Sequence, residues 1–252
     1  MDLGIKDKNV LIVGASKGIG KSITIGFAQE GARITTIARS EDLLEQLNLK
    51  LKQIVDKDHT YYGADIMACD VNQLVNTIIK ERGTFDIVVH NVGGSLVSRN
   101  YLGAFEEWQH ALKFNAGAAI DMNKALIQPM IDKGWGRVIH ISSISAQMLR
   151  GNPLYASAKA FLNAYVTTVG RSIASTGVVM SAVMPGAVAF EGSYWDTFTK
   201  TDPNRCEDFL RHHQAVGRFG TTNEIADVVL FMASEQASFM QAAIIPVAGA
   251  NM

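Results

Sequence analysis

The chain begins its first regular segment with Asn9-Val10-Leu11-Ile12-Val13-Gly14-Ala15-Ser16-Lys17-Gly18-Ile19-Gly20, in which a β-branched run ends in a glycine-rich turn. A helical stretch follows through residues 21–30, and Gly31 is placed to end it. Glycines tolerate the unusual φ of a tight turn and let a pyrophosphate approach the backbone. The free N–H groups and the positive dipole end of the helix would then face the phosphates. The turn therefore predicts a dinucleotide-binding loop, with a plain structural turn as the alternative. Its candidate binding residues are Gly14, Ser16, Lys17, Gly18, Ile19 and Gly20.

Beyond this stretch, short β-branched runs alternate with amphipathic stretches along the whole chain. The predicted strands are 9–13, 33–38, 60–64, 86–90, 137–141, 178–183 and 244–247. The predicted helices are 21–30, 41–55, 71–82, 105–133, 155–175 and 222–233. Apolar strands separated by helices indicate a parallel sheet that is covered on both faces. We expect a single α/β domain over residues 1–252, a three-layer α/β/α Rossmann fold with a doubly wound, mostly seven-stranded parallel sheet. Ligands of such sheets bind beyond the carboxyl ends of the strands.

Composition excludes several classes of protein. The 252 residues carry 23 Lys and Arg against 24 Asp and Glu, a formal net charge of -1, so nucleic acid is not expected as the main ligand. The two cysteines, Cys69 and Cys206, fit no disulfide framework and no metal-ligand spacing, which favours a reducing compartment. The first residues do not resemble a secretion signal, and no apolar stretch is long enough to span a bilayer. We expect a cytoplasmic protein with no membrane partner.

The end of the second predicted strand indicates which dinucleotide is bound. NAD sites usually place an acidic residue there to hold the ribose hydroxyls. Here Arg39 and Ser40 stand at that position, and both can bind a 2′-phosphate, with Lys17 adding positive charge. We therefore expect NADP(H). NAD(H) is the alternative because Glu41 follows directly, and Arg39 would then be a solvated loop residue.

Tyr155 and Lys159 are four residues apart at the start of a predicted helix, so their side chains share one face. A phenol with its ordinary pKa near 10 is a poor proton shuttle at neutral pH. Lowering that pKa to about 7 requires roughly 4 kcal/mol, and an ammonium group about 5 Å away contributes roughly 3 kcal/mol. We therefore expect Lys159 to lower the pKa of Tyr155. The alternative is an exposed helix pair without a catalytic role.

Taken together, these features resemble the short-chain dehydrogenase/reductase family over nearly the whole chain, with the nearest general likeness to 3-oxoacyl-[acyl-carrier-protein] reductases. The matching stretches are Gly14 to Gly20, His90-Asn91-Val92-Gly93, Asn115, Ile141-Ser142-Ser143, Tyr155-Ala156-Ser157-Ala158-Lys159-Ala160, Pro185-Gly186 and Glu224-Ile225-Ala226-Asp227. Each stretch is short, but their order and spacing together are specific.

The resemblance implies a set of catalytic residues. Tyr155 matches the general acid/base, and Lys159 matches its activator and a ligand of the nicotinamide ribose. Asn115 matches the residue that supports a proton-relay water, with a packed amide at a helix interface as the alternative. Ser143 matches the serine that binds the substrate carbonyl oxygen. Ser142 is the alternative, because it has the family's usual spacing of thirteen residues before the tyrosine.

The resemblance also implies further cofactor contacts. Asp65, with its neighbour Ile66, matches the site of the adenine amino group, and Asp70 is the competing match. If Asp65 is correct, Asp70 caps the following helix. The other matching positions are Asn91 and Gly93 beside the adenosine ribose, and Pro185, Gly186 and Val188 beside the nicotinamide.

The chain departs from the family where substrates bind. Phe190 stands where the family commonly has a Thr that bonds the nicotinamide carboxamide, and Ala248 replaces an Asp near the end of the chain. A lid is expected at about 190–219, and Met148 and Arg150 are further candidates to face the substrate. The aromatic and basic residues of the lid fit a sugar, a nucleotide-linked group or an acidic acyl carrier, or else packing on a neighbouring subunit. They are Tyr194, Trp195, Phe198, Arg205, Phe209, Arg211, His212 and His213. His212-His213 has no third ligand, so no metal site is expected.

The resemblance implies an NADPH-dependent reductase that converts a ketone to an alcohol, active on a small-molecule carbonyl or alcohol substrate. It also implies a homotetramer, or alternatively a dimer, assembled through the helices near 105–133 and 155–175. Two other classes remain at this stage. One is a catalytically silent NADP(H)-binding sensor or scaffold, suggested by Phe190 and the altered end of the chain. The other is a tetrameric structural protein.

Overall fold

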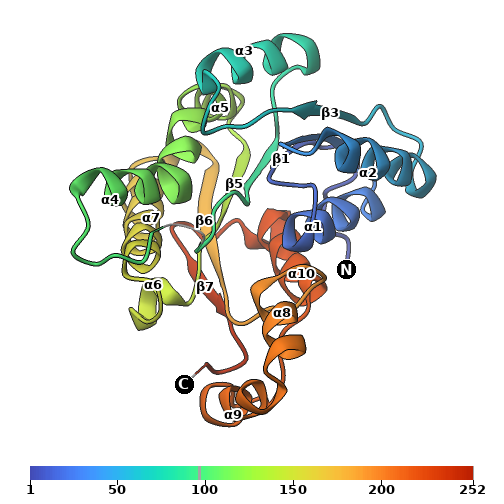
Figure 1. Ribbon diagram of the computed structural model, residues 1–252. Coiled ribbons are helices and arrows are strands. Elements are labelled where there is room, and N and C mark those ends of the chain that lie inside the picture. The colour runs from blue at the N-terminus through green and yellow to red at the C-terminus, as the bar shows by residue number, and fades with distance from the viewer. Residues whose placement is uncertain (96–97, 252) are drawn as a thin grey trace.

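A single seven-stranded parallel sheet forms the centre of the molecule, with the strand order β3-β2-β1-β4-β5-β6-β7 (Figure 1). The computed structural model describes residues 1–95 and 98–251. All seven predicted strands are present: β1 (Asn9–Val13), β2 (Arg33–Ala38), β3 (Thr60–Gly63), β4 (Ile87–His90), β5 (Gly136–Ile141), β6 (Val178–Pro185) and β7 (Ile244–Val247). The strand order reverses between β1 and β4, which is where sheets of this type bind ligands. The predicted Rossmann architecture is confirmed.

Helices cover both faces of the sheet (Figure 1). On one face lie α1 (Gly18–Gln29), α2 (Glu41–Ile54) and α10 (Thr222–Ala233); on the other lie α3 (Val71–Arg82), α4 (Phe105–Leu112), α5 (Ala118–Lys133) and α7 (Pro153–Ser172). None of the helices in the described part of the chain combines the length and hydropathy that a bilayer crossing requires.

The alternation of side chains along each strand explains the two layers. Val10 and Ile12 of β1 pack with the helices on one face, whereas Leu11 and Val13 pack with those on the other. All five residues of β1 are buried, as expected for a strand that is covered on both sides. Phe27 of α1 is fully buried in the first core, and truncating a ring of this kind to Ala typically costs about 3–5 kcal/mol. The sheet is therefore a rigid base for the loops at its carboxyl edge.

The long helix predicted over residues 105–133 has an interruption that the sequence pattern did not indicate. α4 passes into a π-helical segment, Lys113–Gly117, before α5 begins at Ala118. A π segment widens the helix by one residue and is often found at functional sites. Here it contains Asn115, whose side chain is buried.

Near the predicted site, one helix begins earlier than the sequence analysis expected, and three further short helices are present. α7 begins at Pro153 rather than at Tyr155, because Asn152 caps it by accepting hydrogen bonds from the Leu154 and Tyr155 amides at 3.0 and 3.4 Å. The expected lid contains two helices, α8 (Tyr194–Thr201) and α9 (Pro203–His213), at one end of the molecule (Figure 1). A short helix, α6 (Ser145–Met148), precedes α7. α6 and α8 have only 4 and 8 residues, which is shorter than the window over which helical periodicity is read from a sequence.

Candidate active site

The glycine loop joins β1 to α1 in a close-packed turn. Gly18 has φ +57, and a Cβ built on it would lie 2.6 Å from the Phe190 ring. Gly20 has no room for a side chain, because a Cβ there would lie 2.1 Å from the Gly14 carbonyl oxygen. The same oxygen accepts a hydrogen bond of 2.8 Å from Asn91 Nδ2, which ties the loop to the end of β4. Gly18 and Gly20 therefore shape the loop, and neither lines the adjacent cavity.

A cavity of about 410 Å³ lies at the carboxyl edge of the sheet. It extends from the loop after β2 to the start of α7, across the point where the strand order reverses. Every predicted cofactor residue except Gly18 and Gly20 lines it: Gly14, Ser16, Lys17, Ile19, Arg39, Ser40, Asp65, Ile66, Asn91, Gly93, Tyr155, Lys159, Pro185, Gly186 and Val188. Phe114, Phe190 and Trp195 line it as well. Because several loops line this cavity, and the glycine loop is one of them, the cavity fits a dinucleotide.

The charges at one end of this cavity distinguish between the two dinucleotides. Lys17, Arg39 and Ser40 line that end, whereas Glu41 does not line the cavity. Glu41 instead lies over Gly63, where a Cβ would be 3.2 Å from its Oε2. A site with two cationic side chains and no facing carboxylate from this loop fits a 2′-phosphate better than free ribose hydroxyls.

Asp65 and Asp70, the two candidates for the adenine contact, have different positions. Asp65 lines the cavity, and its Oδ1 accepts a hydrogen bond from the Met67 amide at 2.9 Å. Asp70 caps α3 by accepting from the Gln73 amide at 3.0 Å and does not line the cavity. Of the two, only Asp65 is available to a ligand in this cavity.

Ser142 and Ser143, at the end of β5, point in different directions, as expected for neighbours in extended chain. Ser142 Oγ donates a hydrogen bond of 2.6 Å to Asn163 Oδ1. Ser143 Oγ accepts from the Ser145 amide at 3.1 Å, and the Ser143 hydroxyl also interacts with the Tyr155 phenol, which lowers the pKa of the phenol. Ser143 is therefore the serine whose hydroxyl shares a site with the phenol.

Tyr155 and Lys159 lie on one face of α7, where Lys159 is buried and Tyr155 is half-buried. Lys159 is 3% exposed, its Nζ lies 6.0 Å from the centroid of the Tyr155 ring, and it donates a hydrogen bond of 2.7 Å to the Ile141 carbonyl. Burial lowers the pKa of Lys159 to about 7. Burial also raises the pKa of the Tyr155 phenol, although the interaction with the Ser143 hydroxyl acts in the opposite direction.

The expected net lowering of the Tyr155 pKa is therefore wrong, because burial of the phenol raises this pKa. Desolvation penalises the charged form of both groups, the phenolate and the ammonium alike. The simple Coulomb argument omitted this cost, because the sequence does not show how deeply the pair is buried. The pair still has the chemistry for proton transfer: a neutral phenol, and an amine that changes protonation near pH 7.

Asn115 lies beside Lys159 but does not line the cavity of about 410 Å³, nor the second cavity that is described below. Its Oδ1 accepts from the Gly94 amide at 2.9 Å, and its Nδ2 donates to the Ala111 carbonyl at 3.0 Å and to the Gly94 carbonyl at 3.3 Å. A Cβ on Gly93 would lie 2.7 Å from Asn115 Oδ1 and 2.9 Å from Lys159 Nζ, so the three residues meet at this turn. The side chain thus makes the contacts of a packed amide while adjoining Lys159.

A second cavity, of about 710 Å³, lies against the first. The two share Ser143, Tyr155, Gly186 and Trp195. Trp195 packs on Phe209 and Phe219 with ring centroids 4.5 and 5.2 Å apart. Of the residues expected to face a substrate, Met148, Arg150, Tyr194, Trp195, Phe209 and His213 line this cavity, whereas Phe198, Arg205, Arg211 and His212 do not.

The sequence analysis missed Arg99 and Tyr101, which also line the second cavity. They lie in the segment between β4 and α4, where no periodic pattern marks a function. Within the described ranges, no group of three or more His, Cys, Asp or Glu side chains is arranged to hold a metal ion.

Comparison with known proteins agrees with this geometry. Residues 8–194 match the short chain dehydrogenase family. The chain is 26% identical to a 3-oxoacyl-[acyl-carrier-protein] reductase of Thermotoga maritima, over 97% of this chain and 98% of that protein. It is 29% identical to a glucose 1-dehydrogenase of Gluconobacter oxydans, over 92% and 87% of the two chains.

Among solved structures, the L-sorbose reductase of Gluconobacter frateurii, in complex with NADPH and L-sorbose, superposes with a TM-score of 0.90. The two chains are 28% identical, and the match covers 99% of this chain and 98% of the reductase. By its fold, its site and these similarities, the chain belongs to the short-chain dehydrogenase family and is an NAD(P)-dependent oxidoreductase that acts on CH–OH or C=O groups.

Proposed function

We propose that this protein is an NADPH-dependent reductase that converts a ketone to an alcohol, with Tyr155 as the general acid. The observation that carries the proposal is the junction of the two cavities at Ser143 and Tyr155. A ketone in the second cavity would contact both hydroxyls while its carbonyl carbon faces the first cavity. In that position one substrate can meet a proton donor and a nicotinamide ring at the same time.

Two observations support NADP(H) as the cofactor, with NAD(H) the less favoured alternative. Lys17 and Arg39 line the end of the first cavity that Glu41 does not reach, and the structurally similar L-sorbose reductase was solved with NADPH. When bound, NADPH supplies the hydride for the reduction. Lys17, Arg39 and Ser40 would hold its 2′-phosphate, and Asp65 the adenine. Pro185, Gly186 and Val188 would border its nicotinamide.

The residues at and near the junction of the two cavities have different roles in the proposed reaction. Ser143 donates a hydrogen bond to the carbonyl oxygen and stabilises the charge that develops there. Tyr155 gives its proton to the same oxygen, and the Lys159 ammonium stabilises the phenolate that remains. Asn115 holds the Gly93–Gly94 turn against Lys159 through its hydrogen bonds to Gly94. Segment 190–219 covers the substrate as a lid, with Trp195 shared by both cavities.

Assembly and compartment follow from the family likeness and from exposed groups. We expect a homotetramer, with a dimer as the alternative, formed through α4, α5 and α7. Phe105 on α4 and Phe161 on α7 are exposed, and contact with a second copy would remove both rings from water. Cys69 and Cys206 are free thiols, as expected for a protein that acts in the cytoplasm. Light scattering after gel filtration measures the oligomeric state.

The test of the function is NADPH oxidation with a panel of ketones, comparing the wild-type protein with Tyr155→Phe. The panel contains keto-sugars, acetoacetyl thioesters and small diketones. We expect turnover of at least one ketone and a loss of about 10²–10⁴-fold in the variant, the usual contribution of a general acid. NADPH binding by fluorescence should stay near the wild-type value. Full activity of Tyr155→Phe would refute the role of the phenol, and binding of NADPH without turnover of any ketone would favour a silent sensor.

A further inference from the structure

Among the described residues that line the second cavity, every ionisable side chain other than Tyr is basic. Arg99, Arg150 and His213 are the side chains in its lining that are or can become cationic. Among the lining residues that the structure describes there is no Asp and no Glu. The whole protein has a net charge of -1, so a cavity without a carboxylate is not a consequence of a basic composition.

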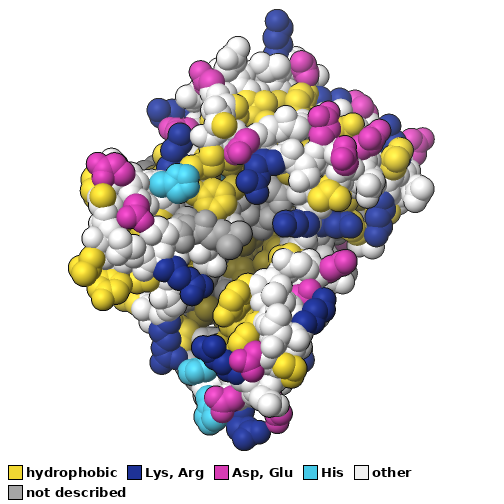
Figure 2. Space-filling model, viewed as in Figure 1, with side chains coloured by type: hydrophobic (Ala, Val, Ile, Leu, Met, Phe, Trp, Pro, Cys, Tyr) yellow, Lys and Arg dark blue, Asp and Glu magenta, His cyan; other side chains and the backbone are white. Residues whose placement is uncertain are grey.

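The three basic residues come from separate parts of the chain. Arg99 follows β4, Arg150 follows α6, and His213 ends α9. Figure 2 shows Lys and Arg side chains on both sides of the hollow that crosses this face of the molecule. The convergence is therefore produced by the tertiary structure and not by a local charged run.

The cations that face the cavity differ from those elsewhere on the lid in their partners. On the outer surface of α8 and α9, Lys200 pairs with Asp196 at 2.9 Å and Arg211 pairs with Glu207 at 3.0 Å. His212 likewise pairs with Asp208 at 3.0 Å. By contrast, within residues 1–95 and 98–251 neither Arg99 nor His213 has a carboxylate partner. Arg99 and His213 can therefore bind an anionic ligand without first giving up an ion pair within the described ranges.

Besides the basic side chains, the second cavity is lined by aromatic side chains. Tyr101, Tyr194, Trp195 and Phe209 form this aromatic part of the lining. A cavity of about 710 Å³ has room for a substrate larger than a simple ketone.

We propose that the substrate is an anionic ketone, whose carboxylate or phosphate binds at Arg99, Arg150 and His213 while its carbonyl binds at Ser143 and Tyr155. This inference rests on the proposed reductase function and specifies its substrate class. In the reaction, the carbonyl carbon gains a C–H bond from the hydride of NADPH, which is oxidised to NADP⁺. The π electrons of the C=O bond move to the oxygen, which takes the Tyr155 proton. The anionic group is unchanged and serves for binding and orientation.

The test uses matched pairs of ketones with NADPH as the reductant. One pair is a keto acid and its methyl ester, and the other is a ketose and its phosphate ester, so the two pairs distinguish a carboxylate from a phosphate. We expect the wild-type enzyme to prefer the charged member of at least one pair by about tenfold or more in kcat/KM, the effect of one charge-assisted hydrogen bond or more. The preference should fall as salt is added, because the arginines are exposed.

The variants Arg99→Gln and Arg150→Gln should each reduce that preference about 10-fold, and the loss should appear mainly as a higher KM for the charged member. Arg171→Gln is the matched control, since Arg171 is also exposed but lies at the end of α7 and lines neither cavity. It should keep the wild-type preference. Equal turnover of charged and neutral members by the wild-type enzyme would overturn the inference and leave the reductase function intact. Absence of turnover of every ketone would instead refute the function.

Discussion

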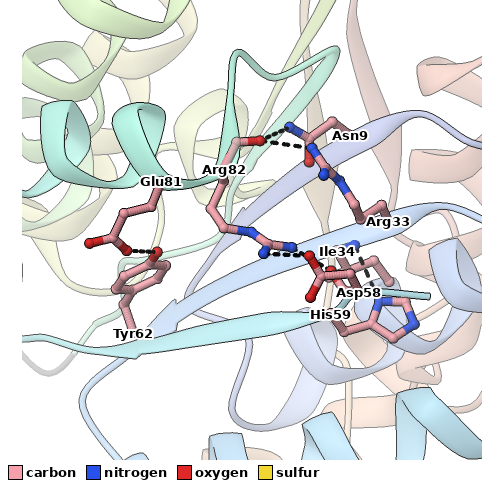
Figure 3. Close-up of polar contacts among 8 residues, drawn as sticks. All are labelled: Asn9, Arg33, Ile34, Asp58, His59, Tyr62, Glu81 and Arg82. Atoms are coloured by element: carbon pink, nitrogen blue, oxygen red, sulfur yellow. Dashed lines mark hydrogen bonds and ion pairs between the residues drawn. The ribbon is translucent and has the colours of Figure 1, made fainter.

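The two edges of the sheet, at the amino and the carboxyl ends of its strands, differ in whether their charged side chains have partners within the chain. At the amino ends of β1, β2 and β3, polar groups from distant parts of the chain hold one another (Figure 3). The Arg82 carbonyl accepts hydrogen bonds from Arg33 and Asn9, at 2.7 and 3.3 Å, and the Arg82 side chain pairs with Asp58 at 2.7 Å. Close by, Tyr62 donates a hydrogen bond to Glu81.

At the carboxyl ends of the strands, by contrast, Lys159 has no charged partner among the described residues. Lys159 is buried with a hydrogen bond to one backbone carbonyl. Burial of the ammonium lowers the pKa of Lys159 to about 7. The comparison indicates that charge neutralised within the chain stabilises the fold, whereas charge left without a partner is available for chemistry. Substitutions at the two ends should therefore affect different properties.

The largest effect is expected for Lys159→Met. Turnover should fall by about 10²–10⁴-fold, because the phenolate left by Tyr155 loses its ammonium partner. Methionine has a similar length and needs no solvation, so the variant should still fold. Steady-state kinetics measure this effect, and activity within tenfold of wild type would show that the lysine is not part of the chemistry.

The same variant should change how stability depends on pH. The pKa of Lys159 is about 7 when folded and near 10.4 when unfolded, so between these values the unfolded chain binds more protons and stability rises with pH. Below pH 7 the cost of burying the ammonium is fully present. Removing the lysine should therefore raise the free energy of unfolding more at pH 6 than at pH 9.5, by on the order of a few kcal/mol. Urea denaturation at the two pH values measures the difference, and an equal change at both would contradict it.

A smaller effect is expected for Arg39→Gln at the other end of the cofactor cavity. Loss of a guanidinium–phosphate contact should weaken NADPH binding about 10–100-fold and leave NADH binding within about threefold. Fluorescence titration with each cofactor gives the two dissociation constants. An equal loss for both cofactors would mean that Arg39 does not face the 2′-phosphate.

The smallest effect is expected at the amino end, for Arg82→Met. Loss of the contacts to Asp58 should lower the free energy of unfolding by only about 1 kcal/mol, because the Arg82 side chain is mostly buried but Asp58 is exposed. Turnover should remain near the wild-type value, since Arg82 lines neither cavity. Lys80→Met on the same helix is the control, because Lys80 is exposed and forms no ion pair that the structure describes. A large loss of kcat in Arg82→Met would contradict the conclusion that groups at the amino ends of the strands affect stability and not turnover.

Much of the site could be predicted from the sequence because its residues lie in short local patterns. The glycine loop, the Tyr155–Lys159 spacing and the Arg39–Ser40 pair each lie within a few residues, and the fold brings all of them to one cavity. Arg99 and Tyr101 could not be predicted in this way, because only the packing of the segment between β4 and α4 brings them to the second cavity. The π segment around Asn115 was missed for the same reason, since its sequence is compatible with an ordinary helix.

A buried cluster of two histidines, an asparagine and a tyrosine could also not be predicted from the sequence. His90 and His140 stack with centroids 4.8 Å apart, and Asn123 joins them to Tyr165. Burial lowers the pKa of His90 to about 4, and burial also lowers the pKa of His140 well below its usual range. In the sequence these four residues are separated by up to 75 positions, and only His90 lies in a stretch that marked a function.

The sequence by itself determined the order of the strands and of most helices, the glycine-rich turn after β1 and the spacing that places Tyr155 and Lys159 on one face of α7, because periodicity and turn chemistry act over a few neighbouring residues. Only the tertiary structure decided which serine faces Tyr155, how far burial shifts the pKa of Tyr155 and Lys159, and which basic side chains meet at the second cavity. These properties depend on desolvation and on distances between segments far apart in the chain, and both arise only when the layers pack.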